Sequence, residues 1–166
     1  MLAYAGVRVR ASTGSADSIS KMWDSGSGRL LQAFKGHEGP VYGASFFPDG
    51  AQMLSVSDDH YIRVWDVETG KAIKKMPPHL GHLSSVRCCA VSPDNSVFCT
   101  GGDDDFVRVW DKRSNMLIRK LISHTRPILS LAFGVDGSNI VSGGWLALTS
   151  TKVRILTHLL VQKYRY

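Results

Sequence analysis

The sequence predicts an all-β fold built from repeated four-stranded antiparallel units. Trp23, Trp65 and Trp110 recur at intervals of 42 and 45 residues, and a fixed period of this size indicates a repeat architecture. Each tryptophan closes a short segment of similar pattern, which reads ISKMWD, YIRVWD or FVRVWD. Around these segments, strand-like runs alternate with turn signals such as PDG about every ten residues, which is typical of antiparallel sheets.

The repeat divides the 166 residues into four units. Units 36–80 and 81–122 are complete, because each opens on Gly-His and then carries four strand-like segments. Unit 1–35 is a partial unit with strands at VRVRAST, ISKMW and RLLQAF, and we expect it to lack its opening strand. Unit 123–166 begins in pattern and then diverges into a C-terminal tail. Its best match to the Trp-Asp strand is TKVRILT, in which Leu156 replaces tryptophan, so this third strand is the one that the sequence specifies least.

Polar residues recur at fixed distances before each tryptophan: a hydroxyl at ten residues, an acid at six and, in the complete units, a histidine at twenty-eight. A buried indole N–H needs an acceptor. A hydroxyl can accept from the indole and donate to imidazole, while an aspartate fixes the histidine tautomer, and such a satisfied network rigidifies a sheet. The sets are Thr13 and Asp17 before Trp23; His37, Ser55 and Asp59 before Trp65; and His82, Thr100 and Asp104 before Trp110.

The Gly-His opening, the spaced hydroxyl and aspartate, and the Trp-Asp close resemble WD40 repeats over about residues 7–145. The resemblance implies a β-propeller in which four side chains form a structural hydrogen-bonded tetrad within each blade. The last unit keeps His124 and Ser142 of this set. The two complete tetrads that the resemblance implies are His37, Ser55, Asp59 and Trp65, and His82, Thr100, Asp104 and Trp110.

A set of histidine, serine and aspartate also has the composition of a catalytic triad. We interpret it as structural because it recurs in successive units, as stabilising motifs of stacked repeats do, and because no nucleophile elbow is present. The run 103–105, three aspartates, lacks the alternating spacing of a calcium loop. We therefore expect no catalytic residue, no cofactor and no metal, and a protein that is not an enzyme.

A closed propeller has about four to eight blades, and this chain supplies about three to four. We therefore expect a partial propeller that does not close a ring on its own. The favoured hypothesis is a fragment or truncated form of a longer propeller. The alternatives are that two copies self-associate into one ring, or that the arc stays open with exposed strand edges.

The resemblance implies an interaction scaffold that binds another protein or peptide through the top face of the propeller. Trp145 either contacts this partner or packs into the C-terminal segment. Arg87 either contacts the partner or forms a surface ion pair with Asp58 or Asp103 that contributes little free energy. Ala16 is the matching position in the first unit. The contact residues implied for the other units are Pro40, Tyr42, Asp58, Ser85, Arg87, Asp103, Pro127, Leu129 and Trp145.

Composition favours a globular chain in the cytoplasm or nucleus, with no membrane partner. Hydrophobic residues make up 43% and charged residues 20%, which is ordinary for such proteins. The three cysteines show no metal-ligand spacing, so we expect small core residues in a reducing compartment. Residues 137–166 hold four basic residues and no acid. The less favoured alternative function is therefore contact with nucleic acid or a ribonucleoprotein through this basic C-terminal segment.

Overall fold

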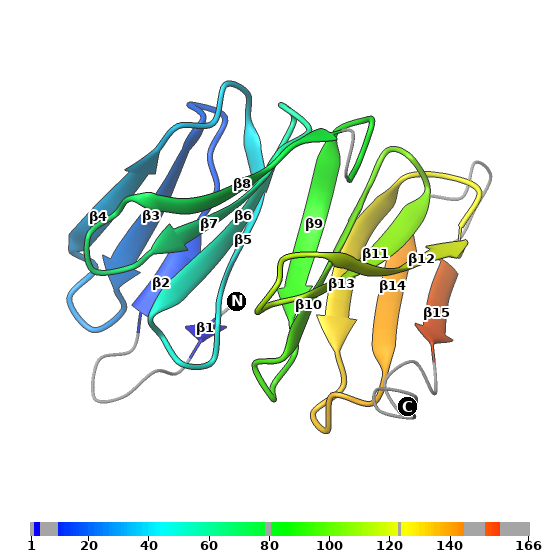
Figure 1. Cartoon of the computed structure of the whole chain (residues 1–166). Helices are drawn as coiled ribbons and strands as arrows, with labels where there is room; N and C mark the ends of the chain where they lie inside the picture. The colour runs from blue at the N-terminus through cyan, green and yellow to red at the C-terminus, as the bar shows by residue number, and fades with distance from the viewer. Residues whose placement is uncertain (1, 4–9, 79–80, 123, 145–151, 157–166) are drawn as a thin grey trace.

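The computed structural model describes residues 2–3, 10–78, 81–122, 124–144 and 152–156, with the backbone alone for the first and last of these ranges. The described residues form four antiparallel sheets that follow one another along the chain (Figure 1), which confirms the predicted all-β class. The first sheet contains β1 (Leu2–Ala3), β2 (Arg10–Thr13), β3 (Ile19–Asp24) and β4 (Leu30–Lys35). The second contains β5 (Val41–Phe46), β6 (Gln52–Ser57), β7 (Ile62–Asp66) and β8 (Ala72–Met76). The third contains β9 (Val86–Val91), β10 (Val97–Gly102), β11 (Phe106–Asp111) and β12 (Leu117–Ile122). The fourth contains β13 (Ile128–Phe133), β14 (Ile140–Gly144) and β15 (Lys152–Leu156).

Each sheet is a meander in which neighbours in sequence are neighbours in space. The expectation that the first unit lacks its opening strand is wrong. Strand β1 pairs with β2 through Leu2 opposite Ala11 and Ala3 opposite Arg10. Two residues are too short to show the alternation by which a strand is recognised in sequence, and backbone pairing with β2 alone defines this strand.

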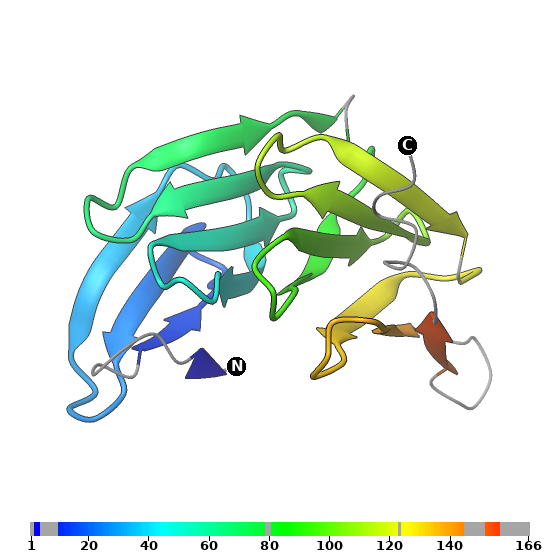
Figure 2. The same ribbon diagram turned by 60° about the horizontal axis from the view of Figure 1, so that its bottom comes forward.

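The four sheets are arranged as an arc, with β1 and β15 at opposite ends in Figure 2. The strands that open the second, third and fourth sheets, β5, β9 and β13, lie next to one another in this order along the arc. A partial propeller has this arrangement, because each sheet packs its face against the next and presents its first strand to the inside of the arc.

The aspartate of the Trp-Asp pair caps the turn that follows it. Oδ1 of Asp66 accepts hydrogen bonds from the backbone N–H and the hydroxyl of Thr69, both at 2.7 Å. Gly70 completes the turn at a φ of 69°, a left-handed conformation that glycine adopts without steric cost. Asp111 binds Ser114 in the same way, so the sequence builds the hairpin before the outer strand from local contacts.

The hydrophobic core lies between the sheets. Alternate residues of β7 face opposite sides: Trp65 packs with residues of the first sheet, whereas Ile62 and Val64 pack against the third. The cysteines follow the same alternation, because Cys88 packs toward the fourth sheet and Cys89 toward the second. All three cysteines are free thiols. Nowhere in the described part of the chain does a helix long and apolar enough to cross a membrane occur.

Candidate functional site

The tetrad of the second sheet is a continuous hydrogen-bonded chain from indole to carboxylate. Nε1 of Trp65 donates to Oγ of Ser55 at 2.7 Å. The same oxygen lies 2.7 Å from Nε2 of His37, and Nδ1 of His37 lies 2.7 Å from Oδ2 of Asp59. Burial alone would raise the pKa of Asp59, but the hydrogen bonds from His37 and from the backbone N–H of Glu38 lower it to about 2.

The third sheet repeats this geometry with threonine in place of serine. Nε1 of Trp110 donates to Oγ1 of Thr100 at 2.9 Å, which lies 2.8 Å from Nε2 of His82. Nδ1 of His82 is 3.0 Å from Oδ1 of Asp104. Burial lowers the pKa of His82 below its usual 6.5, and this effect outweighs the opposite effect of Asp104. Burial therefore favours the neutral form of the ring.

The first sheet carries three members of the set, Thr13, Asp17 and Trp23, and the described part of the fourth carries two, His124 and Ser142. In the first sheet, Trp23 donates to Thr13 at 3.0 Å, and Asp17 binds Lys21 at 2.6 Å. In the fourth, Nε2 of His124 lies 2.8 Å from the hydroxyl of Ser142.

Strand β15 nevertheless occupies the place of the Trp-Asp strand. Leu156 lies opposite Ile140, as Trp110 lies opposite Phe98 in the third sheet. The strand that the sequence specified least is therefore paired in the register that the repeat requires.

Sequence reasoning missed a fifth recurring position in this network, a basic residue two places before each tryptophan. Arg108 lies directly across the ladder from Thr100, and its Nη1 lies 2.6 Å from Asp104. Lys21 holds the same place in the first sheet, opposite Thr13. The sequence contains this signal, because a basic residue stands two places before each of the three tryptophans and before Leu156, which replaces tryptophan in the fourth unit. These residues, Lys21, Arg63, Arg108 and Arg154, lie opposite Thr13, Ser55, Thr100 and Ser142.

Asp59, His37 and Ser55 are hydrogen-bonded in the same sequence as the members of a catalytic triad. The burial and the hydrogen bonds of Ser55 nevertheless indicate a structural role. The side chain of Ser55 is fully buried, and its oxygen already accepts a hydrogen bond from Trp65. A nucleophile must reach the carbon that it attacks. This hydroxyl instead joins β6 to β7 inside the sheet.

The implied contact residues that the structure describes lie at one end of the sheets, where the turns between β2 and β3, β6 and β7, and β10 and β11 are found. We call this end the top face. Here Asp58 joins the second sheet to the third. Its Oδ1 accepts hydrogen bonds from the hydroxyl of Tyr42 at 3.2 Å and from that of Ser85 at 2.6 Å. Tyr42 keeps 41% of its surface exposed.

Arg87 lies beside this group. Its Nε and Nη2 donate to the two carboxylate oxygens of Asp103 at 2.8 and 2.7 Å, and this pairing raises the pKa of Arg87 further above its usual value. The guanidinium carbon also stands 4.4 Å from the centre of the Tyr42 ring. Bidentate pairing and stacking on an aromatic ring together fix the guanidinium plane. We call Tyr42, Asp58, Ser85, Arg87 and Asp103 the top-face cluster.

The remaining implied residues do not join the top-face cluster through side-chain hydrogen bonds. The carbonyl of Pro40 accepts from the backbone N–H of Asp58 at 2.9 Å, which holds the turn. Leu129 is 50% exposed on β13, Pro127 is half-buried, and Ala16 is exposed. Trp145 lies outside the described residues, as does most of the basic C-terminal segment.

The top-face cluster presents a preorganised surface. The cluster contains one cation, Arg87, and two carboxylates, Asp58 and Asp103, so its net charge is negative. Its side chains are held by contacts across two sheets, which lowers the conformational entropy that a partner would have to remove. An exposed tyrosine and a fixed arginine are residue types found at the energetic centres of protein interfaces.

Comparison with known proteins identifies the repeat that forms these sheets. The family model described as "WD domain, G-beta repeat" matches residues 28–66, 71–111 and 115–154. Each of the first two matches begins with or just before the outer strand of one sheet and ends with the Trp-Asp strand of the next. Sequence repeat and sheet are therefore out of phase by one strand, so each repeat covalently joins two neighbouring sheets.

Three curated proteins are similar to part of the chain. The chain is 40% identical over 68 residues to a guanine nucleotide-binding protein subunit beta of Arabidopsis thaliana, covering 40% of this chain and 18% of that protein. It is 47% identical over 62 residues to a Lissencephaly-1 homolog 1 of Paramecium tetraurelia, covering 37% and 15%. It is 38% identical over 76 residues to a nuclear distribution protein nudF of Aspergillus niger, covering 45% and 17%. The matched segment thus spans less than a fifth of each relative. Because the family model covers most of the chain, with the tetrad geometry in register, the chain belongs to the WD40-repeat family.

Proposed function

We propose that this chain is a non-catalytic interaction scaffold that binds another protein through the top face. The observation that carries the proposal is the top-face cluster. Its residues come from two sheets, are joined by hydrogen bonds and stacking, and leave the ring of Tyr42 accessible.

The chemistry of the cluster narrows the kind of partner. Asp58 is half-buried, and its Oδ1 lies between two hydroxyl groups. The excess of carboxylates in the cluster favours a segment with basic or hydrogen-bond-donating side chains. An apolar or aromatic side chain of the partner would pack on Tyr42. Pro40, Pro127 and Leu129 extend the same face on either side and would form its rim.

The test is quantitative capture of partners from a cell extract by the wild-type chain and by the variant Tyr42→Ala/Arg87→Ala. We expect a defined set of proteins to be lost with the variant, because both anchors of the cluster are removed. The matched control is Arg29→Ala/Leu30→Ala, which also removes one arginine and one exposed large side chain, here from around β4 of the first sheet. Retention of every captured protein by the top-face variant, with thermal unfolding unchanged, would show that this face is not the binding surface.

A further inference from the structure

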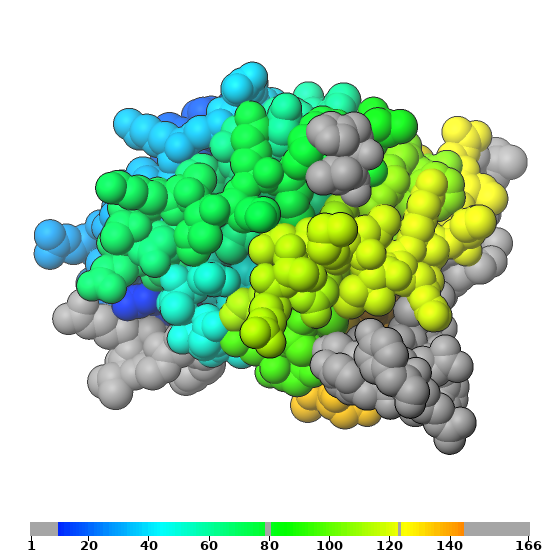
Figure 3. Space-filling model, viewed as in Figure 1, coloured from blue at the N-terminus to red at the C-terminus, as the bar shows by residue number. Residues whose placement is uncertain are grey.

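The outer strands of the second and third sheets carry a concentration of positive charge. Residues 71–76 contain three basic residues, and residues 112–122 contain four, with no acid in either segment. The two segments adjoin on the front of the molecule in Figure 3, and residues of both line one groove. We call the surface of these two segments the basic rim. It is distinct from the acidic top-face cluster.

Three of the seven cations in the basic rim have partners. Nζ of Lys75 lies 3.9 Å from the centre of the Tyr61 ring, and Nζ of Lys120 lies 3.5 Å from that of Phe106. Lys112 donates to Asp49 and, at 2.8 Å, to Asn95. Lys74 and Arg113, like Lys71 and Arg119, have no acidic partner among the described residues.

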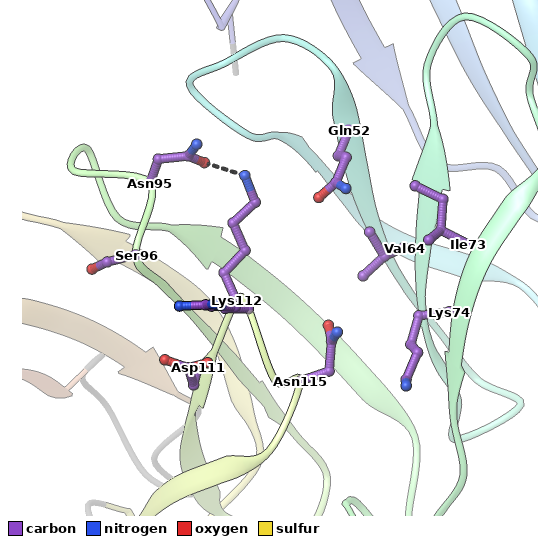
Figure 4. Close-up of a pocket in the computed structure, with 10 residues that line it drawn as sticks. Gln52, Val64, Ile73, Lys74, Asn95, Ser96, Asp111, Lys112 and Asn115 are labelled. Atoms are coloured by element: carbon purple, nitrogen blue, oxygen red, sulfur yellow. Dashed lines mark hydrogen bonds between the residues drawn. The ribbon is translucent and has the colours of Figure 1, made fainter.

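Lys74 and Arg113 line the same groove, although they belong to different sheets. The groove has a volume of about 540 Å³ and lies between β6 to β8 on one side and the turns before β10 and β12 on the other. In Figure 4, Val64, Ile73 and Lys74 stand across the groove from Asn95 and Lys112. Val64 is 4% exposed and Ile73 is 50% exposed. The groove therefore combines aliphatic surface with an excess of positive charge, because Lys74, Lys112 and Arg113 line it together with one carboxylate, that of Asp111.

The Asp49–Asn95–Lys112 contact joins the second sheet to the third beside the groove. Asp49 belongs to the turn before β6, while Asn95 and Lys112 belong to the third sheet. Asn95 Nδ2 donates to Asp49 at 2.7 Å, and Lys112 bridges both residues. A site whose walls are connected in this way needs little rearrangement when a ligand enters.

We propose that this groove is a second binding site, which takes an acidic peptide segment of a partner protein. Carboxylates of the segment would pair with Lys74 and Arg113, and an aliphatic side chain would cover Ile73. The positive charge of the groove favours an anionic partner. The aliphatic side of the groove favours a partner segment that also carries apolar side chains.

Two other anionic partners fit the groove less well. Single-stranded nucleic acid is bound largely by stacking of bases on aromatic rings. The rings of Tyr61 and Phe106 are covered by lysine ammonium groups. An anionic membrane favours a protruding apolar face, whereas Val64 and Ile73 line a recess.

Lysines on edge strands also protect a sheet against edge-to-edge pairing, and this role is sufficient for Lys75 and Lys120. It does not account for the convergence of Lys74 and Arg113, from two sheets, on one groove.

The test measures fluorescence anisotropy of a short labelled peptide that contains two glutamates for every leucine. We expect saturable binding to the wild-type chain and a loss of affinity of about tenfold or more in Lys74→Glu/Arg113→Glu, because two attractive contacts become repulsive. Ile73→Gln should weaken binding even at high salt, where screening has reduced the ionic contribution. The control Arg29→Glu/Lys35→Glu makes the same change in net charge on the first sheet and should bind as the wild type does.

Three results would overturn the proposal. The first is an equal loss of affinity in the control, which would indicate attraction by net charge alone. The second is tighter binding to an oligouridylate or to anionic vesicles than to the peptide. The third is absence of saturable peptide binding by the folded wild type. The variant Tyr42→Ala/Arg87→Ala should bind the peptide normally, so this site and the top face are tested independently.

Discussion

A single hydroxyl links the two halves of each complete tetrad. Ser55 accepts from Trp65 and contacts His37, and Thr100 stands in the same relation to Trp110 and His82. Both hydroxyls are fully buried, where an unsatisfied polar group costs about 1–3 kcal/mol. These residues are regular in the sequence because each sheet must satisfy the same indole N–H.

The protonation of Asp59 should make stability depend on pH in the acid range. The folded pKa is lowered from 3.8 to about 2, so the unfolded chain binds the proton more readily. The stabilisation is therefore complete above about pH 4 and is lost as pH falls from 3.8 toward 2, with a total of up to about 2 kcal/mol.

This dependence is measured as the free energy of urea unfolding between pH 5 and 2. Asp59→Asn should remove the contribution of this residue and flatten the profile in that window. Glu68→Gln, at an exposed carboxyl in the turn after β7, should leave the profile as it is in the wild type. A profile for Asp59→Asn as steep as that of the wild type would mean that His37 does not stabilise the carboxylate.

At the scale of elements, strands and turns were predictable where local chemistry repeats. The turns closed by Asp66 and Asp111 depend on residues three apart, so a short segment of sequence is enough to predict the turn and the Trp-Asp strand before it. Strand β1 has no such local pattern, because its two residues form a strand only by pairing with β2. Strand β15 lies between these two cases. Its sequence partly matches the repeat but lacks the tryptophan, and its pairing with β14 establishes the register.

The junction of β9 and β10 depends on the absence of a side chain at Gly102. A Cβ at this position would stand 2.1 Å from the carbonyl oxygen of Ser85, next to the irregularity in the β9–β10 ladder. Gly102→Ala should therefore displace backbone and destabilise the fold by about 1–3 kcal/mol.

Urea unfolding measures the effect, with Gly26→Ala as the control. A Cβ at Gly26 would meet only a carboxylate oxygen at 3.5 Å, which is ordinary contact. Equal stability of the two variants would show that the strand ends at Gly102 can shift without cost. Because Ser85 also donates to Asp58, Gly102→Ala should disturb the top-face cluster as well.

At the scale of the whole molecule, the sheets are held together by shared cores rather than by separate ones. Phe98 is fully buried, stacks on Trp110 with ring centres 6.1 Å apart, and meets Phe47 of the second sheet edge-on at 6.0 Å. One cluster thus contains residues of the second and third sheets.

Phe98→Ala should destabilise both sheets, by about 3–5 kcal/mol. Native-state hydrogen exchange provides the measurement, because protection should fall in β6 and β7 as well as in β10. Ile118→Ala, which truncates a side chain that is 50% exposed on β12, should change protection little. Loss of protection restricted to β9 through β12 would show that the two sheets unfold independently.

The distribution of charge is also a property of the whole molecule. The chain has a net charge of +6, yet carboxylates outnumber the cation in the top-face cluster, while the basic rim contains the cations of residues 71–76 and 112–122. The composition gives the excess of positive charge but not its position, because residues 71–76 and 112–122 are far apart in sequence and adjoin only in the folded chain.

The sequence by itself determined the repeat, the all-β class, most of the strands and the polar set around each tryptophan. It did so because a strand, a turn and a hydrogen-bonded ladder each draw on residues of one unit, and the unit occurs several times. Only the tertiary structure decided that Arg87 stacks on Tyr42, that Asp58 accepts a hydrogen bond from Ser85, and that Lys74 and Arg113 line one groove. These contacts join different units, and the physical reason is that their geometry depends on how one sheet packs against the next.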